Sequence, residues 1–128
     1  TDYFTKMGFS KAIIGSSGNK VFINCDPTAH AEVMAIRDAC KNLKTTDLSG
    51  CEIYASAEPC PLCTAAIYWS KLEDVYFSNT DEDALEHGFV DKEIMAELKK
   101  PKEKRALLFK RIKNDQAIKI FKRALETF

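Results

Sequence analysis

Two short motifs, each at a predicted helix start, most constrain how this chain can fold. In DPTAHAEV, residues 26–33, a histidine stands two positions before a glutamate. In AEPCPLC, residues 57–63, two cysteines stand three positions apart. Histidine and cysteine at such spacings are typical of metal sites. If both motifs bind one ion, the fold has to bring together two segments that are far apart in the chain.

The pattern around these motifs predicts helices and strands in alternation. Apolar residues recur at three- and four-residue spacing over residues 30–43, which predicts an amphipathic helix that begins at the first motif. Residues 51–56 are typical of a buried strand, and residues 75–78 are typical of another short strand. Pro61 favours a second helix starting at Cys60, because a proline in the first helical turn loses no hydrogen bond.

The remaining segments fit the same alternation. The further predicted elements are a strand at residues 21–23, a short helix over residues 81–87 that stops at Gly88, and a terminal amphipathic helix over residues 115–127. Tyr68 and Trp69 are expected to lie in the core. Strands that alternate with helices predict an α/β fold with layers of helices on both faces of a sheet.

Length and composition indicate one globular domain, residues 1–128. A hydrophobic content of 45% is sufficient for a core. The longest fully apolar run, residues 65–69, is far shorter than the roughly 20 residues that span a bilayer, so no membrane helix is expected. The sequence opens at Thr1 with no pattern typical of a signal peptide. Five cysteines, an odd number, do not indicate a disulfide framework, so we expect a soluble, cytoplasmic protein.

Charge is distributed unevenly although the net charge is zero. Residues 1–98 contain 8 Lys and Arg and 16 Asp and Glu, whereas residues 99–128 contain 11 and 3. An acidic body with a basic tail leaves two interpretations open. The tail binds nucleic acid, or it docks on an acidic surface of its own or a sister chain.

His30, Cys60 and Cys63 are a suitable ligand set for zinc. Imidazole nitrogen and thiolate sulfur are preferred zinc ligands, and three protein ligands leave the fourth position for water or hydroxide, as in catalytic sites. Residues two apart on a helix point to nearly opposite sides, so His30 and Glu32 cannot both face an ion beside the helix. We therefore predict that two helix N-termini converge on the ion. Glu32 would lie beside it as a general acid and base without binding it.

Each motif taken alone has a simpler interpretation. A CxxC pair is often redox-active or half of a structural site, and a histidine before a helix is often a surface or capping residue. The combination of both motifs at helix starts favours zinc. Cys25, Cys40 and Cys51 are expected to remain free thiols in or near the core.

The HxE and PCxxC pair resembles the signature of the zinc-dependent cytidine deaminase-like superfamily. Guanine deaminases and bacterial tRNA adenosine deaminases share the stretch at residues 26–32, so it does not separate them. The segments at residues 65–69, 87–94 and 100–105 look like the guanine deaminase branch. The resemblance implies a three-layer α/β/α fold, with a mixed central sheet and helices on both faces.

For the reaction, the resemblance implies zinc-dependent hydrolysis of guanine to xanthine and ammonia. Glu32 would move the first proton to the ring, and Asp91 would assist the departing amine. Asn19 would hydrogen-bond the purine, and Ala31 and Phe128 would contact it, with Phe128 as an aromatic lid. A helix N-cap for Asp91 and a plain turn residue for Asn19 remain alternatives.

The resemblance also favours one interpretation of the basic tail. It implies a homodimer that exchanges the C-terminal segment, residues 99–128, so that each tail covers the neighbouring active site. The partner would then be a small purine base, with no membrane partner and no nucleic acid.

One departure from the family lies near the N-terminus. Ile13, Ile14 and Gly15 match the second strand of the family but follow directly on a predicted helix, so a strand is missing between them. Either the protein lacks this wall of the pocket, or a segment near Ala12 and Ile13 is omitted from the sequence. We expect the second, because loss of a central element would expose the core face of its neighbours.

Several other functions remain open on the sequence alone. The first is a tRNA adenosine deaminase that uses the basic tail for phosphate contacts. Deaminases of guanosine, of other aminopurines or of cytosine-type bases are close variants. The alternative without catalysis is a zinc-stabilised binding module.

Overall fold

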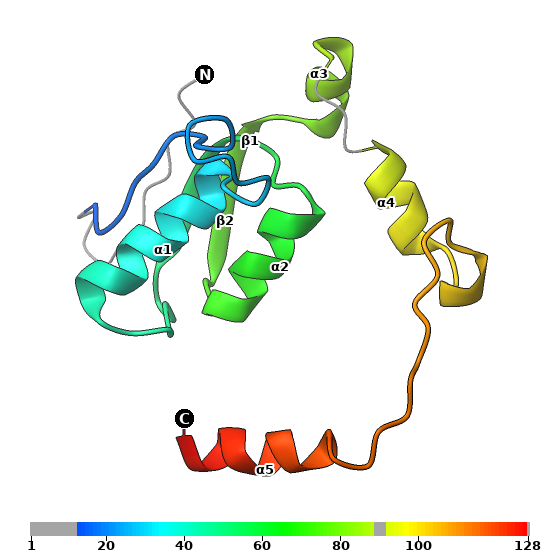
Figure 1. The fold of residues 1–128 in the computed structure, drawn as a ribbon. Helices are drawn as coiled ribbons and strands as arrows, with labels where there is room; N and C mark the ends of the chain where they lie inside the picture. Colours follow the sequence, from blue (N-terminus) through cyan, green and yellow to red (C-terminus); the bar gives the residue numbers. More distant parts are fainter. Residues whose placement is uncertain (1–12, 89–91, 128) are drawn as a thin grey trace. The chain divides into compact units, whose positions relative to one another are not determined.

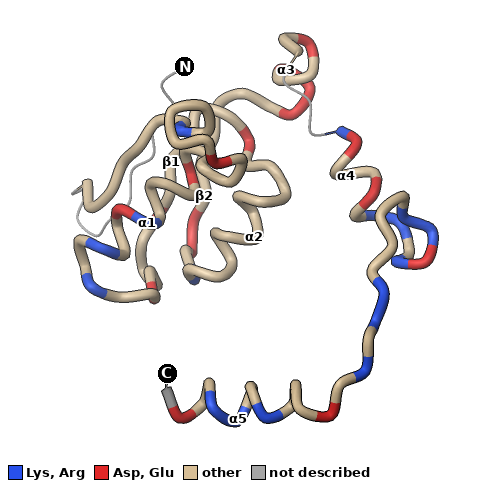
Figure 2. Tube along the Cα trace, in the orientation of Figure 1, with Lys and Arg blue, Asp and Glu red and all other residues tan. Residues whose placement is uncertain are grey.

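The computed structural model describes residues 13–88 and 92–127. Asp91, Phe128 and the predicted gap after Ala12 lie outside these residues, so those predictions stay predictions. The chain divides into two compact units, Thr1–Met95 and Ala96–Phe128. The basic residues are concentrated in the second unit (Figure 2).

Helix α1, Ala31–Leu43, confirms the helix predicted after the first motif (Figure 1). Its buried residues include three alanines, and Ala35 and Ala39 are fully buried. The helix ends where Lys44 adopts a left-handed conformation (φ 52°) and its N–H bonds to the Cys40 carbonyl. Small buried residues on α1 let other segments approach its backbone closely.

Strands β1, Glu52–Ala57, and β2, Asp74–Asn79, pair in parallel and are connected by helix α2, Pro61–Ser70. Parallel neighbours require such a crossover, and their carboxyl ends lie at the same edge of the sheet. The loop that leaves β1 toward α2 therefore lies next to the end of β2. This arrangement confirms the predicted α/β class.

The core lies around β1 and α1. Alternate residues Ile53 and Ala55 of β1 are buried, whereas Tyr54 on the opposite face stacks on Tyr76 of β2 with ring centres 4.8 Å apart. The buried cluster consists of Ala35, Ile36, Ala39, Leu48, Cys51, Ile53 and Ile67. The resemblance implied a larger mixed sheet, and the sheet of the described residues consists of the two parallel strands.

Two details of the predictions for this unit are wrong. Residues 21–25 form a turn rather than a strand, and Phe22 is 93% exposed. Local bonds replace a strand ladder there, since the Asn19 side-chain oxygen accepts from the Val21 N–H and the Val21 carbonyl accepts from the Asp26 N–H. Tyr68 and Trp69, both expected in the core, are 80% and 86% exposed on α2.

The later elements agree with the predictions more closely. Helix α3, Asp81–Glu86, starts with a capping box at Thr80, and Gly88 follows with φ 81°. Helix α4 spans Lys92–Lys99, a short 3-10 turn spans Lys102–Lys104, and helix α5 spans Ile118–Thr127. Helix α5 is three residues shorter at its start than predicted. Among the described residues, no helix is long and apolar enough to cross a membrane.

Residues 13–20 form no strand, so the match of residues 13–15 to a family strand is not reproduced. This segment instead lies against α1. The Ser16 N–H donates to Asp38 Oδ2 (3.0 Å), and Asn42 Nδ2 donates to the Ile14 carbonyl (2.8 Å). A Cβ atom on Gly15 would lie 2.6 Å from the Ala39 nitrogen, so only glycine fits this contact.

We predict that Gly15→Ala lowers the free energy of unfolding by about 1–3 kcal/mol, because the added methyl group would overlap the backbone of α1. Urea denaturation measures this change. Gly18→Ala is the matched control, since no heavy atom lies within 4 Å of a Cβ atom there. Equal stability of the two variants would contradict the close contact.

Candidate metal centre

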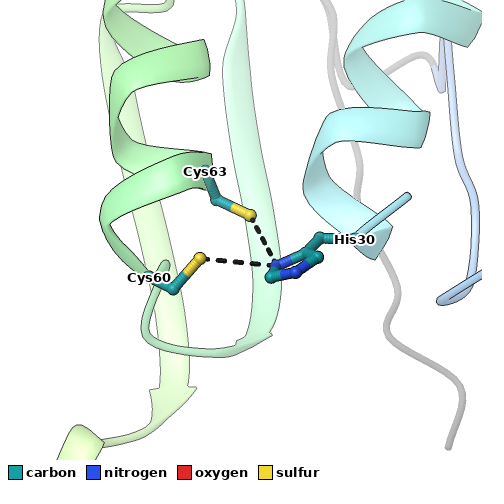
Figure 3. Close-up of side chains that lie close together, drawn as sticks. All are labelled: His30, Cys60 and Cys63. Atoms are coloured by element: carbon teal, nitrogen blue, oxygen red, sulfur yellow. Dashed lines mark hydrogen bonds between the residues drawn. The ribbon is translucent and has the colours of Figure 1, made fainter. Parts of the chain in front are cut away.

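The structure brings together the three residues predicted as metal ligands (Figure 3). His30 Nδ1 lies 3.4 Å from Cys60 Sγ and 3.5 Å from Cys63 Sγ. The three ligand atoms all lie within 4.8 Å of one another. Cys63 is buried, and His30 and Cys60 are partly buried. Side chains from two motifs far apart in sequence thus meet at one point.

The local structure explains why these side chains converge. His30 is the N-cap residue of α1 and Cys60 is the N-cap residue of α2, both with extended backbone. Neither side chain caps its helix, so both are free to turn toward the cluster. Cys63 lies in the first turn of α2, on the side that Cys60 also faces. The predicted convergence of two helix N-termini is therefore observed.

The distances within the cluster fit a zinc ion. A nitrogen at about 2.05 Å and a sulfur at about 2.3 Å from one tetrahedral ion lie about 3.6 Å apart. The two observed nitrogen–sulfur distances, 3.4 and 3.5 Å, are close to this value. One imidazole and two thiolates are also a preferred donor set for zinc. The three residues are placed to bind Zn²⁺ with the fourth position open.

The two thiols differ strongly in acidity. A hydrogen bond from the Cys63 thiol lowers the pKa of Cys60 to about 6, and His30 and the backbone N–H groups of the α2 start act in the same direction. The same bond, together with burial and the nearby Glu32 carboxylate, raises the pKa of Cys63. Cys60 is therefore the first thiolate available to a metal ion, and binding has to displace the proton from Cys63.

Glu32 is a buried carboxylate beside the cluster. It is the second residue of α1 and only 8% exposed. Its side chain lies within hydrogen-bonding reach of Cys63, where it contributes to the raised pKa of that thiol. The carboxylate is not among the three grouped ligand atoms. A buried acid next to a metal site can exchange protons with whatever occupies the open position.

The other predicted site residues, Ala31, Asn19, Asp91 and Phe128, differ in their burial and in whether the structure describes them. Ala31 is buried as the first residue of α1. Asn19 is exposed, and its Oδ1 accepts from the Val21 N–H (2.9 Å), which leaves the amide NH₂ as a donor. The Lys20 N–H donates to the Ala29 carbonyl (2.9 Å), so the Asn19 turn is tied to the residue before the histidine. Asp91 and Phe128 lie outside the described residues.

Glu58, two residues before Cys60, is a further residue of the site that the sequence motifs did not predict. Its backbone N–H donates to the Asn79 carbonyl (2.7 Å), and its Oε1 accepts from the Asp81 N–H (3.1 Å). The sequence contains one signal for such a role, since Glu58 is an acidic residue between a predicted strand and the proline that begins the next helix. Its partners lie more than twenty residues further along the chain, so only the strand pairing reveals them.

Comparisons with known proteins agree with this centre. The sequence model of the cytidine and deoxycytidylate deaminase zinc-binding region matches residues 7–79. Guanine deaminase from Bacillus subtilis is 48% identical over 98 residues, which cover 77% of this chain and 63% of the relative. The tRNA-specific adenosine deaminase from Aquifex aeolicus is 46% identical over 78 residues, which cover 61% of this chain and 50% of the relative. This chain therefore spans less than two thirds of the length of either relative.

A solved structure is similar over nearly the whole chain. The X-ray structure of guanine deaminase from Bacillus subtilis matches with a TM-score of 0.88 at 40% sequence identity. The match covers 98% of this chain and 80% of that chain.

Proposed function

Because this chain belongs to the cytidine and deoxycytidylate deaminase family, we propose that it is a zinc-dependent hydrolase that converts guanine and water to xanthine and ammonia. The observation that supports guanine as the substrate is the similarity to guanine deaminase, at 48% sequence identity and with a structural match over 98% of the chain. The match to the tRNA deaminase is shorter, 78 residues against 98. We therefore keep adenosine in tRNA as the second candidate substrate.

The zinc centre supplies the nucleophile. His30, Cys60 and Cys63 would hold zinc, which when bound would lower the pKa of a water molecule to about 7 and so make hydroxide available at neutral pH. The three side chains would hold the ion where the N-termini of α1 and α2 meet. Half-burial of His30 and Cys60 leaves this position reachable from solvent.

Glu32 is the proton carrier in this proposal. Its burial and its place beside Cys63 support that role, because a carboxylate next to a metal site can exchange protons with a water and a substrate bound there. Glu32 accepts a proton from the water and delivers it to a ring nitrogen.

Two further residues, Asn19 and Ala31, would orient the base. The Asn19 amide NH₂ is a free donor that suits an acceptor on the purine edge, while its Oδ1 stays bonded to Val21. Ala31 has a small buried side chain at the first position of α1, where the backbone N–H can donate to a carbonyl oxygen. These two groups favour a planar base with acceptors on one edge.

The roles of Asp91 and Phe128 stay proposals from the resemblance. Asp91 would take the second proton step and assist the departure of ammonia. Phe128 would close the site as a lid. Each residue is adjacent to a described helix, Lys92–Lys99 for Asp91 and Ile118–Thr127 for Phe128.

We also propose a homodimer in which the segment from residue 99 onward is exchanged. Exposed apolar side chains in the second unit support a partner for that unit, since large apolar areas rarely stay in water. They are Leu107, Leu108, Phe109, Ile112, Ile118, Ile120, Phe121 and Leu125. The basic charge of this segment suits the acidic body (Figure 2). Tyr68 and Trp69 on α2 offer a further exposed apolar surface to a second copy.

We place the activity in the cytoplasm and in purine metabolism. The two thiol ligands have to stay reduced to bind zinc, and a reducing compartment maintains them in that state.

The substrate is tested by measuring ammonia release from guanine, guanosine, adenine, cytosine, cytidine and a tRNA hairpin that contains adenosine. We expect release from guanine and little from the other five, because the proposed contacts match one purine edge. Release from the hairpin alone would replace guanine with the tRNA substrate. Bound zinc without release from any of the six would favour a binding module.

For Glu32 we predict that Glu32→Gln lowers kcat for guanine by about 10²–10⁴-fold, because the amide cannot carry the proton. Zinc content, measured by atomic absorption, should stay at the wild-type value, since Glu32 is not among the grouped ligand atoms. Glu52→Gln on β1 is the matched control and should retain activity. Full activity of Glu32→Gln would end the assigned role.

The dimer is tested by light scattering of the purified protein. We expect a mass twice that of the 14.4 kDa chain. A chain that ends at residue 117 should show a lower kcat/KM for guanine, because it lacks α5 and Phe128. A monomer with full activity on guanine would rule out the exchanged segment.

A further inference from the structure

Glu58 connects the metal-binding loop to the end of the neighbouring strand. Its backbone N–H donates to the Asn79 carbonyl at 2.7 Å, which extends the pairing of β1 with β2 one residue beyond the Ala57 and Asn79 pair. Its Oε1 accepts from the Asp81 N–H at 3.1 Å, at the first residue of α3. Glu58 therefore hydrogen-bonds to the residues on either side of Thr80, which are Asn79 and Asp81.

The backbone between Glu58 and Cys60 is conformationally restricted, so it cannot readily compensate for a displacement of Glu58. Pro59 fixes its own φ angle and restricts Glu58 to extended conformations. The Pro59 carbonyl accepts from Thr64 Oγ1 (3.3 Å), and the Cys60 carbonyl accepts from the Thr64 N–H (2.8 Å). Because this segment is stiff, a displacement of Glu58 also displaces the Cys60 thiol.

The Glu58 carboxylate has no place among the ligands themselves. The grouped metal-binding atoms within the described part of the chain belong to His30, Cys60 and Cys63. The carboxylate of Glu58 is occupied with a backbone N–H more than twenty residues away. Its contribution to the centre is therefore indirect, through where it holds the loop.

We propose that Glu58 is a positioning residue whose bond to the Asp81 N–H sets the location of Cys60 and thereby the zinc affinity of the centre. The inference deepens the proposed function, yet it depends on the zinc centre alone and not on which base is the substrate. Residues that support metal ligands indirectly typically change metal affinity by about 10–100-fold.

Three substitutions separate the hydrogen bond from the charge. Glu58→Ala removes both. Glu58→Gln keeps the length and an acceptor oxygen but loses the charge. Glu58→Asp keeps the charge but is one methylene too short for the bond to Asp81. Glu52→Ala is the matched control, since Glu52 lies on β1, the strand that precedes Glu58, and its Oε1 accepts a local bond from the Tyr54 hydroxyl (2.8 Å).

Zinc affinity is measured by competition with a chromophoric chelator, and cobalt substitution reports the thiolate geometry by absorption. We expect Glu58→Ala and Glu58→Asp to bind zinc about 10-fold more weakly, at the lower end of that range, with altered cobalt spectra. Glu58→Gln and Glu52→Ala should resemble the wild type. Cys63→Ser shows the response to loss of a ligand itself.

Either of two outcomes would overturn the proposal. Wild-type zinc affinity and cobalt spectrum in Glu58→Asp would mean that the bond to Asp81 has no effect on the centre. Weak binding in Glu58→Gln with wild-type binding in Glu58→Asp would assign the effect to charge instead. If Glu58→Ala fails to fold, the Gln and Asp pair still decides. Absence of guanine turnover would leave these zinc measurements unaffected, so the two failures are distinguishable.

Discussion

The meeting of two helix N-termini at one point is the constraint on which the rest of the first unit depends. His30 and Cys60 each precede a helix, and their side chains approach to 3.4 Å. Parallel pairing of β1 with β2 places the loop after β1 at the sheet edge where α2 starts. Small residues on α1, such as Ala35 and Ala39, allow close packing behind the centre. Without this approach, the motifs would be two unrelated fragments.

The ligand cluster and the helices that carry it could be predicted from sequence because their signals are local. Apolar residues spaced three and four apart predict α1, and a proline at the first helical position predicts the start of α2. The donor types of His30, Cys60 and Cys63 indicate the metal chemistry directly. Each of these signals depends on residues within one turn of helix or one short motif.

Features that depend on distant partners could not be predicted in the same way. Residues 21–23 are apolar enough for a strand, but side-chain and turn bonds around Asn19 and Asp26 compete successfully with a ladder. Exposure of Trp69 depends on which surface the fold leaves uncovered, which no local pattern states. The contact between Glu58 and Asp81 exists only once β1 and β2 are in register.

Because His30 and Cys63 lie on separate segments, a bound zinc ion would crosslink the chain in addition to its proposed role in the reaction. The ligands lie at the starts of α1 and α2, so one ion would close the loop between His30 and Cys63 within the first unit. A preformed site of this kind is lost on unfolding, which makes the binding free energy part of the folding free energy. Above the dissociation constant, each tenfold rise in free zinc adds about 1.4 kcal/mol to stability. The fold thus couples the abundance of the folded chain to the zinc supply around it.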